Sequence, residues 1–189
     1  MGSGALLADE TSARRRRAFD RLTSTELERA YRLATIILGD PEDARDAVHD
    51  ACVVAWRAFA ELRDHDRFDA WFGRILVNTC RQQLRRRLRV VPAHDLADPA
   101  VPAHELVDSS LPDPAERLAR VDVLERAVRR LGPDHRMVVA LRFFADLTVE
   151  EIAGRTGERS GTVKSRLHYA LRELRAAYEA VEREGGSRP

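Results

Sequence analysis

The sequence is poor in cysteine and lacks any long uncharged apolar run. Its 189 residues include two cysteines, Cys52 and Cys80, which are too few for a disulfide-stabilised scaffold and fit a reducing compartment. A transmembrane helix needs about 20 consecutive apolar residues, and no segment of this chain offers them. The short apolar patch Ala5–Ala8 precedes the arginine run Arg14–Arg17, whereas a secretory signal peptide has these features in the opposite order. We therefore expect a cytoplasmic protein.

Lysine and the common signatures of catalysis are also scarce. Lys164 is the single lysine among 32 basic residues, and 31 acidic residues leave a net charge of +1. This near balance argues against a protein that is basic over its whole surface, so the distribution of charge along the chain carries more information. The sequence has no glycine-rich phosphate loop, nucleophile elbow or paired-carboxylate site, and no HxxxH or CxxC spacing. We expect no enzyme activity, no cofactor and no metal.

Apolar residues recur at helical spacing through most of the chain, and no segment alternates with period two. The sequence therefore predicts an all-α fold. Six helix starts carry capping patterns, in which a side-chain oxygen or a proline suits the first helical turn. They lie at Thr23–Glu26, Asp40–Pro41, Asp113–Pro114, Gly132–Pro133, Thr148–Glu151 and Ser160.

The composition changes in the middle of the chain. Residues 90–116 hold five of the eight prolines, six acidic residues and no lysine or arginine. This density of proline is incompatible with a long helix or a central strand. We predict two small helical domains, an extended linker and two tails. Their boundaries are a flexible tail over 1–22, domains over 23–89 and 114–180, an acidic linker over 90–113 and a tail over 181–189.

The segment from Thr148 to Leu174 has the pattern of a helix-turn-helix. A short helix, a tight turn containing Gly157 and a longer helix from Ser160 would place the second helix in a DNA major groove. Its outward positions carry hydrogen-bond donors and no carboxylate before Glu173, whereas a solvated face usually mixes charges. An ordinary helical hairpin is the alternative. The buried face of the last helix is expected to consist of Val163, Leu167, Leu171, Leu174 and Tyr178.

The first predicted domain ends in an arginine cluster. Residues 81–89 contain five arginines and no acid. Cations at a helix C-terminus complement the helix dipole, and the alternative role is contact with nucleic-acid phosphates. The aromatic and amide residues upstream suit unstacked bases, although we expect Phe68 and Phe72 to be core in so small a domain.

These two segments resemble regions two and four of the bacterial extracytoplasmic-function (ECF) sigma factors. The residues of region two are matched by Gly39–Ala44, Asp46–Asp50 and Arg67–Phe72, and those of region four by Leu147–Ala153 and Gly161–His168. ECF sigma factors are not enzymes. They bind core RNA polymerase and direct it to promoters.

The resemblance implies three sets of site residues. The polymerase-binding set, on the second helix, would dock on the clamp helices of the β′ subunit, and the second domain would contact the β flap. This set comprises Asp43, Asp46, His49, Asp50 and Arg57. The loop Glu61–Asp69 and the third helix would open the minus-ten element and hold a flipped base, through Arg67, Trp71, Asn78, Arg81 and Arg85. The last helix would read the minus-thirty-five element, through Arg159, Ser160, Thr162, Lys164, Ser165, Arg166, His168, Tyr169 and Arg172.

Three positions depart from the family pattern near the polymerase-binding set. His49 stands where Gln is common, Asp50 where Glu is common, and Cys52 where an aromatic is common. These changes bear on individual contacts rather than on docking itself. At the minus-ten set, Gln82 replaces an acid, so the base preference can differ from that of typical members.

The resemblance also suggests partners and leaves alternatives open. The acidic linker could occupy a positively charged polymerase channel as a polyanion mimic, or it could be a plain tether. We expect an anti-sigma factor as a further partner, and weak duplex binding by the free protein because each module makes few phosphate contacts. The alternatives are a stand-alone helix-turn-helix regulator and a sigma mimic that sequesters an anti-sigma factor. A redox role for Cys52 and Cys80, the relative orientation of the domains and the role of Arg14–Arg17 stay open.

Overall fold

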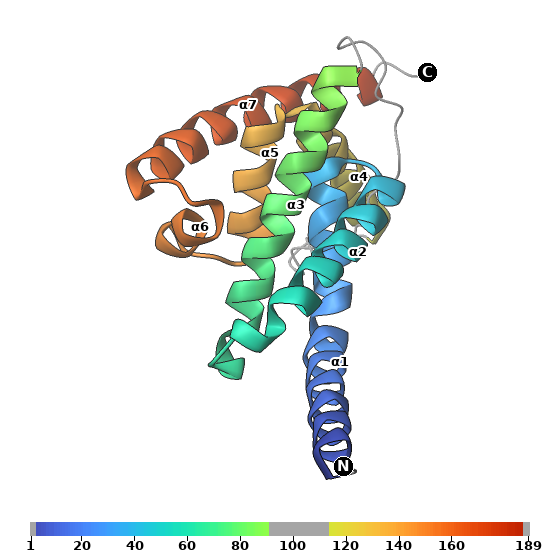
Figure 1. The fold of residues 1–189 in the computed structure, drawn as a ribbon. Helices are drawn as coiled ribbons and strands as arrows, with labels where there is room; N and C mark the ends of the chain where they lie inside the picture. Colours follow the sequence, from blue (N-terminus) through green and yellow to red (C-terminus); the bar gives the residue numbers. More distant parts are fainter. Residues whose placement is uncertain (1–2, 91–113, 187–189) are drawn as a thin grey trace.

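The computed structural model describes residues 3–90 and 114–186, which form helices joined by short turns (Figure 1). The described residues contain no strand, which confirms the all-α prediction. The predicted linker, from residue 91 to 113, lies outside the described residues. The α-helices of the described residues are α1 (Ser3–Leu38), α2 (Pro41–Ala58), α3 (Phe68–Val90), α4 (Pro114–Arg130), α5 (Pro133–Val139), α6 (Val149–Thr156) and α7 (Ser160–Gly186). Three single turns are η1 (Phe59–Glu61), η2 (His65–Arg67) and the π-helical turn η3 (Ala140–Phe144).

Helix starts with strong local signals are where the sequence predicts them. The Asp40 carboxylate accepts a hydrogen bond from the Asp43 amide at 2.9 Å and caps α2. The capping box of α6 is complete, because the Thr148 hydroxyl and the Glu151 carboxylate each accept from the other's backbone amide. Gly157 then ends α6 with a φ of +71°, a left-handed conformation that glycine adopts without strain.

The N-terminal segment differs from the prediction. The flexible tail over 1–22 is wrong for the described residues, and so is a helix start at Thr23, because α1 runs unbroken from Ser3 and buries Thr23 within it. Phe19 is 8% exposed and packs edge-on against Trp56 and Phe59, with ring centroids 5.2 Å apart in both pairs. Packing against α2 and η1 thus overrides the local capping signal, as tertiary contacts commonly do.

The C-terminal segment also differs. The helix α7 continues to Gly186 and fully buries Val181, so the tail predicted over 181–189 is wrong for its first part. On the predicted buried face, Val163 and Leu167 are buried, but Leu171 is 44% exposed. The neighbouring residue Ala170 is fully buried in the core instead of Leu171.

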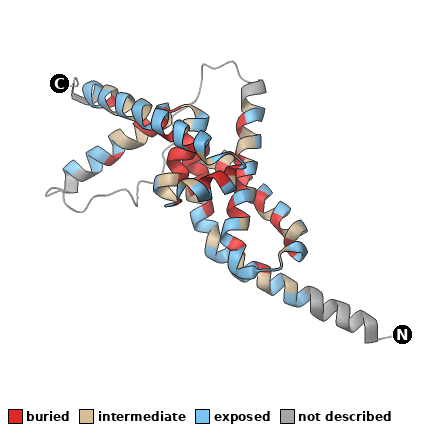
Figure 2. Cartoon of the chain, turned by 90° about the vertical axis from the view of Figure 1, so that its left-hand side faces the viewer, coloured by how far each residue is buried: buried red, intermediate tan, exposed pale blue. Residues whose placement is uncertain are grey.

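The N-terminal helices (α1–α3) and the C-terminal helices (α4–α7) share one buried core. Its largest members include Ile37 and Phe72 from the first group and Met137, Leu141 and Ile152 from the second. The two groups meet where α1 packs on α5 and η3 and where α3 packs on α6. Figure 2 shows the buried residues gathered at this crossing. The relative orientation that the sequence leaves open is therefore a closed one.

The burial of Phe19 makes the first half of α1 part of the fold. We expect Phe19→Ala to lower the free energy of unfolding by about 3 kcal/mol, because it removes a large buried aromatic side chain. Leu27→Ala, on the same helix but at a side chain that is 41% exposed, should cost less than about 1 kcal/mol. Urea titrations of both variants measure this difference. Equal midpoints would show that residues around Phe19 do not pack on the body of the protein.

Candidate nucleic-acid interface

The helices α6 and α7 form a compact helix-turn-helix. Ile152 on α6 and Val163 on α7 are fully buried between them, and Leu167 is 8% exposed. The turn closes through the Gly157 amide, which donates to the Ala153 carbonyl at 2.9 Å. These contacts fix the angle at which α7 leaves the turn, as a recognition helix requires.

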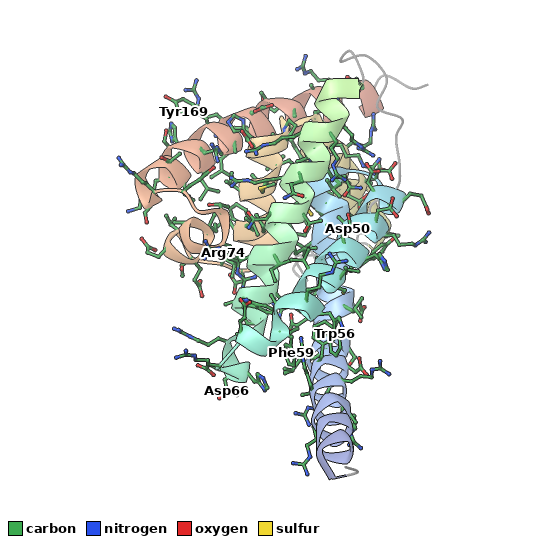
Figure 3. The ribbon with its side chains drawn as sticks, viewed as in Figure 1. Asp50, Trp56, Phe59, Asp66, Arg74 and Tyr169 are labelled. Carbon is green, nitrogen blue, oxygen red and sulfur yellow. The ribbon has the colours of Figure 1, made fainter. Side chains whose placement is uncertain are left out.

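The outer face of α7 presents almost the whole set predicted from the sequence. The exposed members are Arg159, Thr162, Lys164, Ser165, His168, Tyr169 and Arg172, whereas Ser160 and Arg166 are half-buried. Tyr169 is 55% exposed, packs edge-on against His168 with centroids 5.5 Å apart, and points away from the body of the protein (Figure 3). This face offers hydrogen-bond donors and an aromatic ring to a ligand.

A second face runs along α3. One side of α3 carries Trp71, Asn78 and Arg85, which follow one another at intervals of seven residues. Arg67, at the end of η2, lies four residues before Trp71 and extends the same side. Arg67, Asn78 and Arg85 are exposed and Trp71 is half-buried. Phe68 and Phe72 point inward, are each 2% exposed and stack at 5.5 Å, as expected for core residues.

Sequence reasoning missed Arg74 on this face. Arg74 is exposed and lies three residues after Trp71 and four before Asn78, so it belongs to the same stripe. Figure 3 shows it on the side of α3 that faces α6. The helical register of the predicted residues was the signal that could have found it.

A third exposed face lies on α2. Asp46, His49, Asp50 and Arg57 are exposed along it, at spacings that keep them on one side. Between them lies Val54, an apolar side chain that is 47% exposed and that sequence reasoning missed. An apolar centre inside a charged rim is an arrangement that protein-docking surfaces share.

Asp43, the other residue predicted for this surface, has a partner within the protein. Its carboxylate pairs with Arg87 near the end of α3, and its amide is capped by Asp40. The Asp43 side chain is 23% exposed, so it stabilises the packing of α2 on α3.

The α3 face and the recognition helix meet at one carboxylate. Glu158, in the turn before α7, accepts a hydrogen bond from Arg81 of α3 on Oε1 and from Arg166 of α7 on Oε2, each at 2.5 Å. Arg81 also donates to the Thr156 carbonyl at 2.6 Å. Each of the three side chains is about a fifth exposed (18%, 19% and 21% for Arg81, Glu158 and Arg166). We call this arrangement the Glu158 junction.

The electrostatics of the Glu158 junction favour the charged forms. Burial alone would raise the pKa of the Glu158 carboxyl, but the hydrogen bonds and charges of Arg166 and Arg81 outweigh it and lower that pKa. The hydrogen bond to Glu158 likewise raises the pKa of Arg166. The junction is therefore an ion-paired cluster at neutral pH, and protonation of Glu158 in acid would weaken it.

Two further arginines link the helix groups. Arg136 of α5 is 5% exposed and donates through Nε to the Ile37 carbonyl of α1 at 2.9 Å. Burial, together with the charges of Arg87 and Arg129, lowers the pKa of Arg136 to about 10. Arg155 of α6 lies 3.6 Å from Asp69 and so close over Gly73 that a Cβ there would be 2.3 Å from its guanidinium.

A cleft of about 230 Å³ lies beside these contacts, between the N-terminal and the C-terminal helices. Leu33, Ile36 and Leu76 line it from one side, and Val128 and Phe144 from the other. The two groups therefore meet through charged contacts and an incompletely filled apolar seam.

Both cysteines are free. Cys52 is half-buried on α2, and Cys80 is fully buried on α3. Burial raises the pKa of the Cys80 thiol to about 12, so it stays protonated at neutral pH and is a poor nucleophile.

Comparison with known proteins gives a consistent family. The model of Sigma-70 region 2 matches residues 22–90, and that of Sigma-70 region 4 matches residues 127–176. The RNA polymerase sigma-E factor of Streptomyces avermitilis is 33% identical over 163 residues, which cover 86% of each chain. The ECF RNA polymerase sigma factor SigM of Mycobacterium tuberculosis H37Rv is 32% identical over 162 residues, covering 84% of this chain and 76% of SigM.

Two solved structures share the architecture. CnrH, solved in complex with the cytosolic domain of CnrY, aligns with a TM-score of 0.59 at 25% identity, covering 93% of this chain and 96% of CnrH. The sigma factor RpoE, solved with the anti-sigma factor NepR from Bartonella quintana, aligns with a TM-score of 0.66 at 21% identity, covering 85% of this chain and 96% of RpoE. Within the described ranges, no helix is long and apolar enough to span a membrane.

The Glu158 junction predicts how the two helix groups are held together. Glu158→Gln removes the negative charge and leaves a single acceptor oxygen for the two arginines, because the amide NH2 group cannot accept a hydrogen bond. This should weaken the closed arrangement by about 2 kcal/mol, or roughly 30-fold in the ratio of closed to open forms. Amide hydrogen exchange of α6 measures this opening. The matched control is Glu150→Gln, which removes the same charge from an exposed position on α6 and should leave exchange unchanged. Equal protection in the Glu158 variant and the wild type would contradict the prediction.

Proposed function

Because the chain belongs to the ECF family of RNA polymerase sigma factors, which bind core polymerase and direct transcription initiation at promoters, we propose a role for each of its three exposed faces. The α2 face docks on the β′ clamp helices, the α3 face captures the opened minus-ten element, and the α7 face reads the minus-thirty-five element. We further propose that the N-terminal and C-terminal helices separate before the two promoter elements are bound together.

The observation that carries this proposal is the Glu158 junction. Arg81, from the minus-ten face, and Arg166, from the recognition helix, lie within the span of a single carboxylate. By their names, the two promoter elements lie about 25 base pairs apart, which is roughly 85 Å along a duplex. One molecule cannot contact both elements while these arginines share Glu158. The closed form is therefore the resting state of the free protein.

The minus-ten face combines stacking with readout of base edges. An opened base has an exposed ring, which Trp71 can stack on, and free edge atoms, which the Asn78 amide can bind. Arg67, Arg74 and Arg85 lie around them and would contact the phosphates. Arg81 joins this set when it leaves Glu158.

The minus-thirty-five face divides in a similar way. Lys164, Ser165, His168 and Tyr169 lie on the exposed side of α7 and would meet base edges or nearby phosphates. The other members, Arg159, Ser160, Thr162, Arg166 and Arg172, would mainly contact phosphates. Phosphate contacts position the helix and base contacts specify the sequence.

The α2 face would dock on the polymerase. Val54 supplies an apolar centre, and Asp46, His49, Asp50 and Arg57 supply the charged rim. The contact of the C-terminal helices with the β flap is carried over from the family resemblance. In Figure 3 Asp50 and Arg74 lie on opposite sides of α3, so docking through α2 leaves the α3 face free for DNA.

An anti-sigma factor is a further partner in this proposal. CnrH, which is similar over most of its length, was solved with the cytosolic domain of CnrY. A protein that binds both helix groups at the cleft between them would stabilise the closed form by mass action. Co-purification from the native cell tests for such a partner.

Transcription in vitro separates the roles of the two DNA faces. Asn78→Ala should lower initiation about tenfold and abolish the effect of base changes in the minus-ten element, because a base contact is worth about 1–3 kcal/mol. Lys164→Ala should do the same for the minus-thirty-five element. Arg175→Ala, on α7 beyond the recognition face, is the control. Run-off assays with core polymerase and templates altered in either element measure both effects. A variant that keeps full sensitivity to its element would refute its assignment.

Binding to core polymerase tests the α2 face. Val54→Asp places a charge at the centre of the proposed docking surface and should weaken core binding about 30-fold, the effect of losing a hot spot of about 2 kcal/mol. Leu27→Asp, at a similarly exposed apolar residue of α1, is the matched control. Titration of labelled protein with core polymerase gives both affinities. Wild-type affinity in the Val54 variant would rule out this face as the docking site.

A further inference from the structure

The N-terminal half of α1 carries an arginine run to which the three faces give no role. This part of α1 projects beyond the other helices (Figure 1). It is nevertheless attached firmly. The Arg15 guanidinium lies 4.8 Å from the centroid of the Trp56 ring and donates to the Trp56 carbonyl at 2.9 Å, and Phe19 is buried one turn later. Arg15 therefore has a structural role that its neighbours do not share.

Three arginines form a stripe on the opposite side of this helix segment. Arg14, Arg17 and Arg21 are exposed, and at 3.6 residues per turn they lie within about 60° of one another around the helix axis. None of their guanidinium groups forms an ion pair or a hydrogen bond with another described residue. Arg45 on α2 is an exposed arginine that does have a partner, because it pairs with Glu42 at 2.7 Å.

The spacing within the stripe disfavours a purely structural role. Arg17 and Arg21 are four residues apart, and Arg14 and Arg17 are three apart, so each pair repels on the helix surface. Such repulsion destabilises the helix unless an anion lies across the stripe. The arrangement is the one expected of a surface that binds a polyanion.

The stripe lies at the minus-ten end of the protein. Phe19, on the inner side of the same segment, packs against Phe59 and lies 6.2 Å from Phe68 at the start of α3. Phe59 in turn stacks on His65 of η2 at 5.0 Å. Asp66 of η2 lies at the same end of the molecule as the projecting part of α1 (Figure 3). One aromatic cluster thus connects the helix segment that carries the stripe with the loop that precedes the α3 face.

We propose that Arg14, Arg17 and Arg21 bind the phosphates of promoter DNA that flanks the opened minus-ten element. This inference rests on the proposed function of the α3 face and extends that face along the DNA. The stripe extends over eight residues, with about 10 Å of helix between Arg14 and Arg21, which matches two to three nucleotides of a strand. Because phosphates are the same in every promoter, the stripe raises affinity without altering sequence preference.

The test is the salt dependence of promoter binding by holoenzyme. The triple variant Arg14→Gln, Arg17→Gln, Arg21→Gln removes three phosphate contacts. The fall of log K with log salt should therefore be less steep, by about 2 to 3 in the slope. The advantage of the wild type over the variant should then shrink about 40-fold between 50 and 200 mM salt. The matched control removes the same charge from the exposed residues Arg120, Arg175 and Arg183 and should keep the wild-type slope.

Two further measurements keep the outcomes distinct. Core binding by the triple variant should equal that of the wild type. Weakened core binding with an unchanged salt slope would show that the stripe contacts the polymerase, and would overturn the proposal, as would wild-type behaviour in both assays. Asn78→Ala holoenzyme is measured in parallel. If the Asn78→Ala holoenzyme binds promoter DNA like the wild type, the assignment of the α3 face fails. If the Asn78→Ala holoenzyme binds poorly but the triple variant keeps the wild-type salt slope, only the proposal for the stripe is overturned.

Discussion

The carboxylate of Glu158 is the point at which the α3 face and the α7 face constrain each other. It satisfies one arginine from α3 and one from α7, and it can do so only while the turn before α7 lies against α3. In the proposed function these arginines exchange the carboxylate for a DNA phosphate, which accepts a similar charge-assisted hydrogen bond. The exchange is close to balanced for each arginine. The free energy of separating the two helix groups therefore depends on their other contacts and on the binding energy that the polymerase contributes.

That contact has the character of an interface that opens. Arg136 is buried against the Ile37 carbonyl, Arg155 lies across Gly73, and a cleft of about 230 Å³ leaves the apolar seam incompletely filled. Interfaces between domains of one chain are generally more polar than domain cores, and relative motion is their usual behaviour. Separation returns Arg136 to water, where its charge is better solvated, so part of the cost of opening is recovered.

Local and non-local signals account for what the sequence could and could not predict. The caps at Asp40 and Thr148 depend on neighbours within four residues, so the sequence predicts them correctly. The length of α1 depends on Phe19 reaching Trp56 from a distant helix, and no local pattern shows that contact. Leu171 follows the apolar spacing of α7, but the neighbouring helices pack against a different side of α7, the one that carries Ala170.

The exposed faces show the same division. Reading the register of α3 from Trp71 would have found Arg74, and reading that of α2 would have found Val54, because a helix face follows from spacing alone. No register would have paired Arg81 with Glu158, since the pairing requires the two helix groups to be docked. The sequence therefore indicates which residues share a helix face and says little about whether the two helix groups are docked.

The closed form gives a physical reason for the polymerase to be the trigger. A free molecule that binds one promoter element in the open form gains one set of phosphate contacts and loses the whole contact between its helix groups. A core enzyme that binds α2 at one site and the C-terminal helices at another would bind the open form more tightly than the closed form. The ratio of these two affinities sets how far it shifts the protein toward the open form. In the proposed function, DNA would then meet both faces already separated, and the released Arg81 and Arg166 would add their charges where they bind phosphate. Coupling of this kind makes promoter binding depend on polymerase without any change in the DNA-reading residues themselves.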